Sequence, residues 1–356
     1  MSNMKKTIRT AAAVGVALAL ALGTCITVFA ADAPAKEIHI RTAADLSEFA
    51  KKCSLDSWSD GKHVILDSDI SLAGMDFNPI PIFNGLFDGC GHEISDLKLT
   101  APMSPCGLFL ETGKDAEIRL LTVSGTINPS GDDSQVGGII GVNRGTVNAC
   151  IFNGSVNGKS CVGAVAGQNE STGVITRCRV SGTVFGLGQA GGIVGQNNGS
   201  VLDCENRSFI NTQSIDPSLQ PDKLDTSSLL NLFGSITSEN ADITANIGGI
   251  AGGNDGFVEL CSNNGTVGYL HLGCNVGGIA GRSGGHISGC TNTGDVFGRR
   301  NAGGIVGKAE PLVEVTKARD LLAGLGYRMQ SLNKSIDTAI KDAGDGSEDQ
   351  IGRAHV

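Results

Sequence analysis

The sequence predicts an all-β solenoid, in which short strands form coils that stack along one axis. A glycine-rich pentad, GGIIG at Gly137, recurs with its first glycine at Gly163, Gly191, Gly248, Gly277 and Gly303, so the repeat is 26 to 29 residues with one interval of 57. Short β-branched runs punctuated by Gly and Asn fill each repeat, without helical periodicity. Glycine makes up 52 of 356 residues and aromatic residues only 4%, so we expect an aliphatic interior without large aromatic anchors.

Residues 1–30 are predicted to be a secretory signal peptide. A positively charged start precedes an apolar run from about Ala11 to Gly23, and small residues lead to a cleavage site after Ala30. The run is too short to argue for a spanning helix, and no longer apolar run follows. We therefore expect a secreted or cell-surface protein with no transmembrane span in its mature part.

The formal charge of −9 argues against a nucleic-acid partner, because neutralising phosphates requires clustered Lys and Arg.

Residues 31–133 are expected to form an N-terminal cap and the opening coils. Thr42 and Asp45 predict a capping box for a short helix from Ala43 to about Lys52, which would cover the first coil. Residues 134–310 carry the repeats. An insertion over 209–245 accounts for the double interval and would project from the scaffold as a binding loop.

Equivalent positions of the repeats predict ladders of stacked residues. A second glycine ladder consists of Gly141, Gly167, Gly195, Gly252, Gly281 and Gly307. An asparagine ladder consists of Asn143, Asn169, Asn197 and Asn254, and a cysteine ladder consists of Cys150, Cys178, Cys204, Cys261 and Cys290. In the second repeat, two extra residues in the turn NESTG move all later positions together, so the coil keeps its alternation of inward and outward side chains.

Each ladder has a structural interpretation and an alternative. The glycines suit corners and close packing. Asparagine hydrogen-bonds along a stack and tolerates left-handed corners, whereas the alternative is calcium or sugar binding. The cysteines are predicted to be buried thiols that pack like small apolar residues, with cross-rung disulfides as the alternative and Cys161 and Cys274 as the pair to watch.

The sequence offers no catalytic constellation. The stretch HEISD at His92 lacks the second histidine of a zinc-protease motif, and no CxxC pair occurs. Asp203, Glu259 and Asp295 fall at different repeat positions, so no acidic stripe for glycan cleavage is expected. We therefore predict no catalytic residue, no cofactor and no metal site in this chain.

Residues 311–346 predict a heptad helix, as the start of a coiled-coil stalk or a helical hairpin. The apolar seam consists of Val315, Ala318, Leu322, Leu325, Met329, Leu332, Ile336, Ala339 and Ala343. Self-association through this seam is expected, and folding back onto the last coil is the alternative. Residues 347–356 are expected to be a truncated, artefactual end.

The repeats VGGIIGVNRGTVNACIFNGSVNG and AGGIVGQNNGSVLDCENRSF resemble GLUG repeats, and the stretches FNGLFDGCGHEISDLKL and IRTAADLSEFA resemble the segments that precede such repeats. The resemblance covers about residues 38–310. GLUG repeats occur in secreted or surface-bound bacterial proteins, including adhesin-like proteins and the non-catalytic regions of immunoglobulin-A-protease-like metallopeptidases. The resemblance implies a right-handed parallel β-helix.

The signal peptide, the solenoid repeats and the heptad segment together suggest two functions. The first is a non-catalytic, adhesin-like display scaffold that binds an unknown protein or glycan at the cell surface. The alternative is an accessory N-terminal region of a larger secreted enzyme, a metallopeptidase or a glycan-active protein, with its catalytic domain beyond this sequence.

Overall fold

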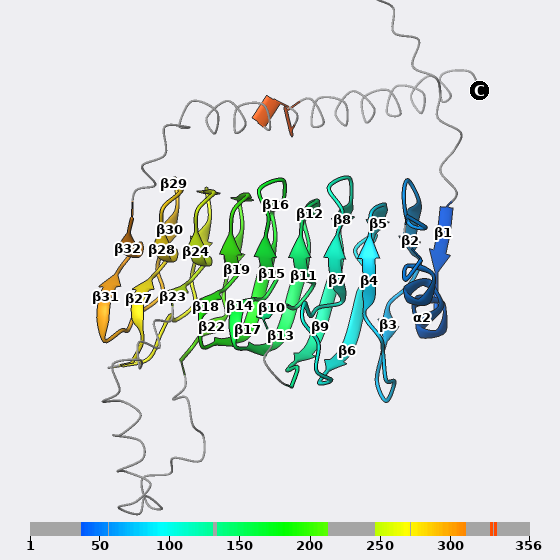
Figure 1. The fold of residues 1–356 in the computed structure, drawn as a ribbon, viewed down its shortest axis with the longest axis horizontal. Coiled ribbons are helices and arrows are strands. Elements are labelled where there is room, and N and C mark those ends of the chain that lie inside the picture. Colours follow the sequence, from blue (N-terminus) through cyan, green and yellow to red (C-terminus); the bar gives the residue numbers. More distant parts are fainter. Residues whose placement is uncertain are drawn as a thin grey trace, which may run out of the picture.

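The computed structural model describes residues 37–55, 57–130, 134–212, 246–270, 272–310, 328–329 and 331–332. In this part the chain is a parallel β-solenoid (Figure 1). Each complete coil contributes one strand to each of four sheets in turn, and equivalent strands of successive coils pair in parallel. Sheet 2 has eight described strands, one per coil, so the described solenoid has about eight coils. The predicted all-β solenoid is confirmed, whereas its right-handedness stays a prediction.

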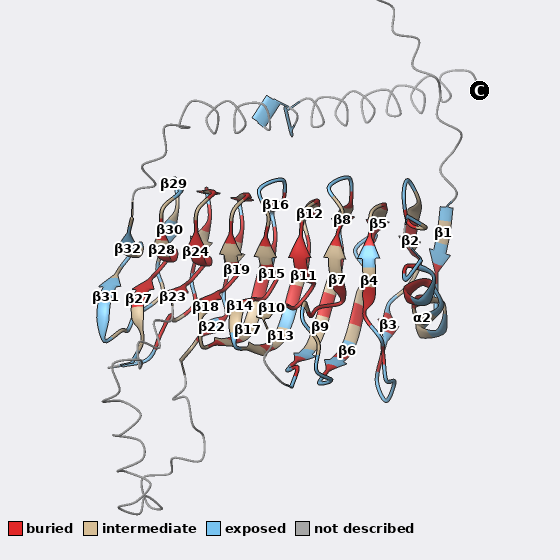
Figure 2. Cartoon of the chain, viewed as in Figure 1, coloured by how far each residue is buried: buried red, intermediate tan, exposed pale blue. Residues whose placement is uncertain are grey.

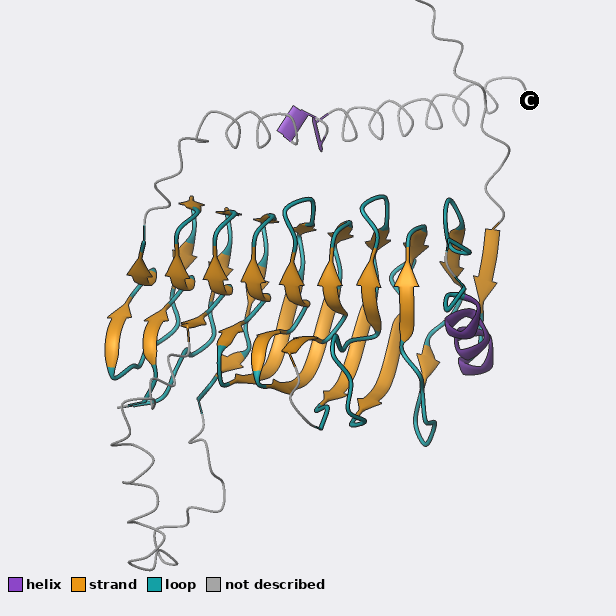
Figure 3. Cartoon of the chain, viewed as in Figure 1, coloured by secondary structure: helices purple, strands orange, loops and turns teal. Residues whose placement is uncertain are grey.

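The four sheets are numbered in the order in which a coil passes through them, and short turns connect their strands (Figure 3). Sheet 1 contains β10 (Ser134–Gly137), β14 (Ser160–Gly163), β18 (Gln189–Gly191), β23 (Asn246–Gly248), β27 (Cys274–Gly277) and β31 (Arg300–Gly303). Sheet 2 contains β4 (Ile80–Phe83), β7 (Phe109–Thr112), β11 (Ile140–Asn143), β15 (Ala166–Asn169), β19 (Val194–Asn197), β24 (Ala251–Asn254), β28 (Ala280–Ser283) and β32 (Val306–Ala309).

Sheets 3 and 4 complete each coil. Sheet 3 contains β1 (Glu37–Ile40), β2 (His63–Leu66), β5 (Leu86–Asp88), β8 (Glu117–Arg119), β12 (Thr146–Asn148), β16 (Val174–Thr176), β20 (Ser200–Leu202), β25 (Phe257–Glu259) and β29 (His286–Ser288). Sheet 4 contains β3 (Ile70–Ser71), β6 (Glu93–Leu99), β9 (Thr122–Ile127), β13 (Ile151–Gly158), β17 (Arg179–Gly186), β21 (Glu205–Asn206), β26 (Ser262–Asn263) and β30 (Thr291–Asn292), and β22 (Phe209–Ile210) also pairs with β17.

The two extra residues of the second repeat lie in the turn between sheets 2 and 3. Asn143 pairs with Asn169 in sheet 2, and Thr146 pairs with Val174 in sheet 3. The register is therefore the same before and after the longer turn. A slip of one residue would have turned the apolar side chains of the next strand outward.

Buried positions recur along the whole solenoid (Figure 2). The buried residues are mostly aliphatic, and large aromatic side chains are concentrated at the start. Ile139 and Ile193, at equivalent pentad positions, are fully buried. Phe83, Phe87 and Phe109 form a buried cluster with ring centroids 5.4 to 6.2 Å apart. The expectation of a core without aromatic anchors is thus wrong for the opening coils, because the low aromatic content is concentrated there.

The helix α2 (Ala43–Lys52) lies at the N-terminal end of the solenoid (Figure 1). Its capping box forms as expected, since Thr42 accepts a hydrogen bond from the Asp45 amide and the Asp45 carboxylate accepts one from the Thr42 amide. Leu46, Phe49 and Ala50 are the buried face of α2, and Phe49 packs against the rings of Phe83 and Phe87. The amphipathic pattern of the helix therefore extends the aromatic cluster to the end of the solenoid.

The insertion begins later than the sequence predicted. Phe209 and Ile210 form β22, in register with Thr183 and Val184. Asn211 fixes the chain beyond this strand, because its side chain accepts from the Gly186 amide at 2.8 Å and donates to the Gly186 carbonyl at 2.6 Å. Ile210 is fully buried and pairs with Val184 in the coil before and Val267 in the coil after, so the solenoid holds the chain to this point.

Several predicted segments lie outside the described residues. These are the signal peptide 1–30, the remainder of the insertion at 213–245, the end at 347–356, and the heptad helix 311–346 except for its residues 328, 329, 331 and 332. Within the described part, no helix has both the length and the apolar character needed to span a membrane.

Candidate functional site

The second glycine ladder marks a close approach between sheets 1 and 2. A Cβ atom at any of its six positions would lie 2.2 to 2.6 Å from another atom of the protein, a distance that real Cβ contacts do not show. Gly195, for example, faces the backbone of Cys161 in sheet 1 of the preceding coil. These positions are Gly141, Gly167, Gly195, Gly252, Gly281 and Gly307, and none has a φ in the left-handed region. They serve close packing and not left-handed corners.

One left-handed corner of the coil is occupied mostly by residues other than glycine or asparagine. It lies between sheets 3 and 4, directly before the cysteine ladder. Its members are Leu120, Ala149, Arg177, Asp203 and Leu260, with φ of 50 to 55°, and Gly289 with φ of 62°. The residues of the asparagine ladder are not among the left-handed positions, so the corner interpretation of that ladder is wrong. An L-residue in this conformation costs about 1–2 kcal/mol, which the packing of the coils must offset.

The asparagine ladder is a buried chain of side-chain amides. Asn143 donates to Asn169, Asn169 to Asn197, and Asn197 to Asn254, each from Nδ2 to Oδ1 at 2.8 Å. Thr112 precedes the ladder and Ser283 follows it, through hydrogen bonds of 2.9 and 3.1 Å. Because these amides are buried and bonded to one another, their polar atoms are satisfied along the solenoid axis.

A second amide ladder was missed by the sequence reasoning. Asn206 donates to Asn263 at 2.6 Å, and Asn263 donates to Asn292 at 2.7 Å. Each lies two residues after a ladder cysteine, and this constant offset was the signal that could have revealed it.

The cysteine ladder is buried except at its last member. Cys150, Cys178, Cys204 and Cys261 are buried and Cys290 is half-buried, and all are free thiols. Each thiol donates to the carbonyl two residues earlier, at 3.3 to 3.5 Å. Burial raises the pKa of the Cys150 and Cys204 thiols well above the ordinary value, which keeps them protonated at neutral pH.

The suggested pair of Cys161 and Cys274 does not form. Cys161 lies on β14 and Cys274 on β27, and the strands β18 and β23 separate them in sheet 1. Cys161 instead donates from Sγ to Gln189 Oε1 at 2.9 Å. Both cysteines precede a pentad in the sequence, but they differ in register and in coil.

Of the three acidic residues at different repeat positions, Asp203 and Glu259 lie on neighbouring coils, where the Asp203 amide donates to the Glu259 carbonyl at 3.0 Å, whereas Asp295 lies between β30 and β31. Glu259 is nearly buried and pairs with Arg328 at 2.5 Å and with His286 at 3.6 Å. Asp203 occupies the left-handed corner, and Asp295 accepts a backbone hydrogen bond from Val267. Among the described residues, no group of three or more His, Cys, Asp or Glu side chains is arranged to hold a metal ion.

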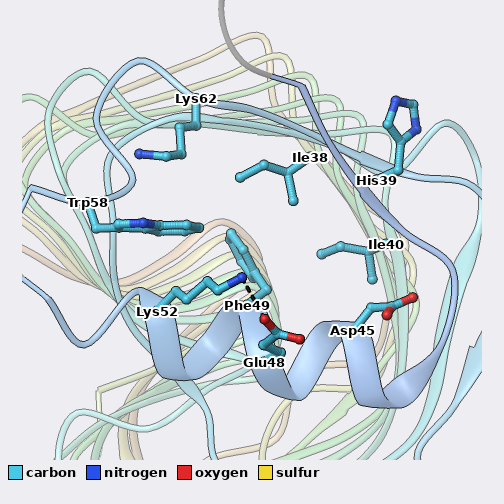
Figure 4. Close-up of a pocket in the computed structure, with 9 residues that line it drawn as sticks. All are labelled: Ile38, His39, Ile40, Asp45, Glu48, Phe49, Lys52, Trp58 and Lys62. Carbon is cyan, nitrogen blue, oxygen red and sulfur yellow. Dashed lines mark ion pairs between the residues drawn. The ribbon is translucent and has the colours of Figure 1, made fainter.

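A pocket of about 240 Å³ lies at the N-terminal end of the solenoid, between α2, β1 and the turn that precedes β2 (Figure 4). Its apolar walls are the rings of Phe49 and Trp58 and the side chains of Ile38 and Ile40. The two rings meet edge to face, with centroids 6.0 Å apart. The ammonium of Lys62 lies over the Trp58 ring, 4.3 Å from its centroid. The pocket combines a half-buried aromatic face with a charged rim.

Most of the charged groups at this rim have partners. Lys52 pairs with Glu48 at 2.6 Å, and His39 lies 2.9 Å from Asp67 on the outer side of β1. Hydrogen bonds from the Arg41 and Thr42 amides lower the pKa of Asp45, whose carboxylate is used by the start of α2. Among the described residues, no carboxylate lies within ion-pair distance of Lys62, so its positive charge is the one at the rim that no acid compensates. The sequence reasoning missed this pocket, because its residues come from three separate elements.

No family model matches the chain and no curated protein matches it in sequence, so the resemblance to GLUG repeats stays a prediction. Among solved structures, the chain is similar to a Bacteroides ovatus protein provisionally assigned as an immunoglobulin A1 protease. The two share 16% sequence identity with a TM-score of 0.49, and the similarity covers 77% of this chain and 84% of the other.

Proposed function

We propose that this chain is a non-catalytic, secreted or surface-displayed scaffold of the adhesin type, which presents loops and its end pocket to a protein or glycan partner. The observation that carries the proposal is the use of the repeated polar and reactive side chains in packing. The amides of Asn143, Asn169 and Asn197 bond one another inside the solenoid, and the thiols of Cys150 and Cys204 are buried there. Because these side chains are used in packing, they favour a rigid scaffold over a catalytic surface.

The finer features of the proposal rest on the sequence together with local contacts. In it, α2 serves as the cap of the first coil, since its buried face covers the aromatic cluster that would otherwise meet solvent. The coil is right-handed, and the leader is removed after Ala30. The heptad segment mediates self-association, and the side chains of Met329 and Leu332, both in its seam and each 60% exposed, support this role.

Deletion of residues 213–245, closed by a short Gly-Ser linker, tests the proposal. The deletion leaves the bonds between Asn211 and Gly186 in place and does not touch β22 or β23, so the solenoid is expected to keep its melting temperature. Adhesion of cells or beads that display the chain should be lost. Removal of Ser171 and Thr172, the two exposed residues of the NESTG turn, is the matched control, and it should leave adhesion intact. Full adhesion by the folded deletion variant would contradict the proposal.

A further inference from the structure

We propose that the pocket at the N-terminal end of the solenoid binds the terminal residue of an acidic glycan, a pyranose ring that carries a carboxylate. The proposal deepens the proposed function and rests on it, because it names the chemical class of the partner. Three properties of the pocket lead to it: its size, its aromatic walls and its uncompensated positive charge.

The size of the pocket limits the occupant to one ring. The volume of the pocket is about 240 Å³. It is smaller than the usual range for drug-sized ligands, about 300–1,000 Å³. A single pyranose with its substituents fits such a space, whereas a longer oligosaccharide would have to extend outward. The pocket therefore suits the end of a glycan chain.

The walls suit a ring with one apolar face. Trp58 and Phe49 present aromatic surface, and Ile38 and Ile40 lie on the side away from Trp58 (Figure 4). The C–H groups on one face of a pyranose pack against such surface as an aliphatic side chain does, while its hydroxyl groups stay at the polar rim. The half-buried Trp58 offers an apolar surface to the ring face, while the polar rim beside it can accept the hydroxyl groups.

The charge of the pocket selects an acid. Lys62 is the lining cation that no described carboxylate neutralises, since Lys52 is held by Glu48 and His39 lies beside Asp67. Cys53, near Lys62, adds no negative charge, because burial raises the pKa of its thiol to about 12. A ligand carboxylate at the rim would form a charge-assisted hydrogen bond with the Lys62 ammonium. A neutral sugar of the same shape would leave that ammonium without an anionic partner.

The sequence supplies a direct readout, because Trp58 is the single tryptophan of the chain. Tryptophan emission of the full chain thus reports on this pocket without a label. We expect a saturable change in emission on titration with methyl glucuronide. Methyl glucoside, which has the same ring without the carboxylate, should bind about tenfold more weakly or worse, in line with a charged hydrogen bond of about 1.5–3 kcal/mol.

A pair of lysine variants separates the site from general electrostatics. Lys62→Gln keeps most of the side-chain stem and should weaken glucuronide binding about tenfold or more. Lys51→Gln makes the same change of charge on the exposed side of α2 and should bind glucuronide as the unmodified chain does. Circular dichroism and melting temperatures check that both variants are folded.

Four results would overturn the inference: no saturable change with glucuronide, equal affinity for the glucoside, unchanged affinity in Lys62→Gln, or tighter binding of benzoate than of glucuronide. The last would assign the pocket to aryl acids. The test is independent of the adhesion experiment. A Trp58 response together with full adhesion by the loop-deleted chain would support the pocket and contradict the adhesive role of the insertion. No Trp58 response together with lost adhesion would contradict the pocket and support that role.

Discussion

The side-chain amide of Asn169 donates to the Oδ1 atom of Asn197 in the next coil at 2.8 Å and accepts from Asn143 in the coil before. Asn143 and Asn197 are fully buried, so water does not reach their side chains. The bonds between amides therefore satisfy polar atoms that would otherwise have no partner. The ladder therefore couples three coils through one side chain.

Replacing Asn169 with Ala is expected to lower the free energy of unfolding by about 3 kcal/mol, because it leaves the Asn197 acceptor and one Asn143 contact unsatisfied inside the solenoid. Urea unfolding followed by circular dichroism measures the change. The control is Asn153→Ala on the exposed side of β13, where a change within about 0.5 kcal/mol is expected. Equal effects at the two sites would show that the ladder bonds add nothing.

The second glycine of the pentad can be compared between an inner coil and the last coil, at Gly192 and Gly304. A Cβ on Gly192 would lie 2.1 Å from the carbonyl oxygen of Gly249, whereas a Cβ on Gly304, in the last coil, would meet nothing within 4 Å. Gly192→Ala should destabilise the protein by about 1–3 kcal/mol or prevent folding. Gly304→Ala should be neutral or stabilise it by up to about 1 kcal/mol, since it restricts the unfolded chain. Thermal unfolding compares the two, and similar losses would contradict the packing explanation.

The left-handed corner offers a stabilising substitution. Leu260 has φ of 55° and its side chain is 67% exposed, so it carries backbone strain with little burial in return. We expect Leu260→Gly to raise stability by about 0.5–1 kcal/mol. At Leu55, which is 62% exposed but not left-handed, the same change should lower stability. A drop in melting temperature for Leu260→Gly would mean that its contact with Gly289 outweighs the strain.

The exposed and buried cysteine thiols are expected to differ strongly in their rate of alkylation. Iodoacetamide applied to the folded protein is expected to modify the exposed Cys90 and to spare Cys150, Cys178 and Cys204, which are buried and protonated or hydrogen-bonded. Peptide mass spectrometry before and after denaturation locates the labels. Protection that persists in denaturant without reductant would reveal cross-rung disulfides and contradict the free-thiol assignment.

Asp88 should make stability depend on pH in the acid range. Burial alone would raise its pKa, but hydrogen bonds from the Cys90 amide at 2.9 Å and from Arg119 at 2.7 and 2.8 Å outweigh burial and lower the pKa below its ordinary value. A lowered folded-state pKa stabilises the protein above the unfolded value, about 3.9, and this contribution is lost as the pH falls through the folded value. Urea unfolding at about pH 7 and about pH 3 gives the free energy of unfolding at each pH. The decrease in this free energy from about pH 7 to about pH 3 should be smaller for Asp88→Asn than for the unmodified chain. Asp115→Asn, at an exposed carboxylate, is the control with the same change of charge.

Periodic features were readable from the sequence, and features that depend on distant elements were not. The solenoid, its ladders of Asn and Gly, and the displacement by NESTG follow from residues that recur at fixed offsets. The left-handed corner recurs as well, but Ala149, Arg177 and Asp203 share no side-chain property, since the backbone and not the residue type is repeated there. The end pocket joins Ile38 and Trp58 across α2, and no offset in the sequence marks such a contact.

The longer turn after Asn169 has a practical consequence for engineering. It changes the length of one coil while the ladders on both sides keep their partners, so the chain can vary at this bend at little thermodynamic expense. A short foreign peptide grafted between Asn169 and Val174, or at the same bend of neighbouring coils, would be held at a fixed spacing along a stiff rod. Several copies at consecutive bends would form a regularly spaced array about 4.8 Å apart.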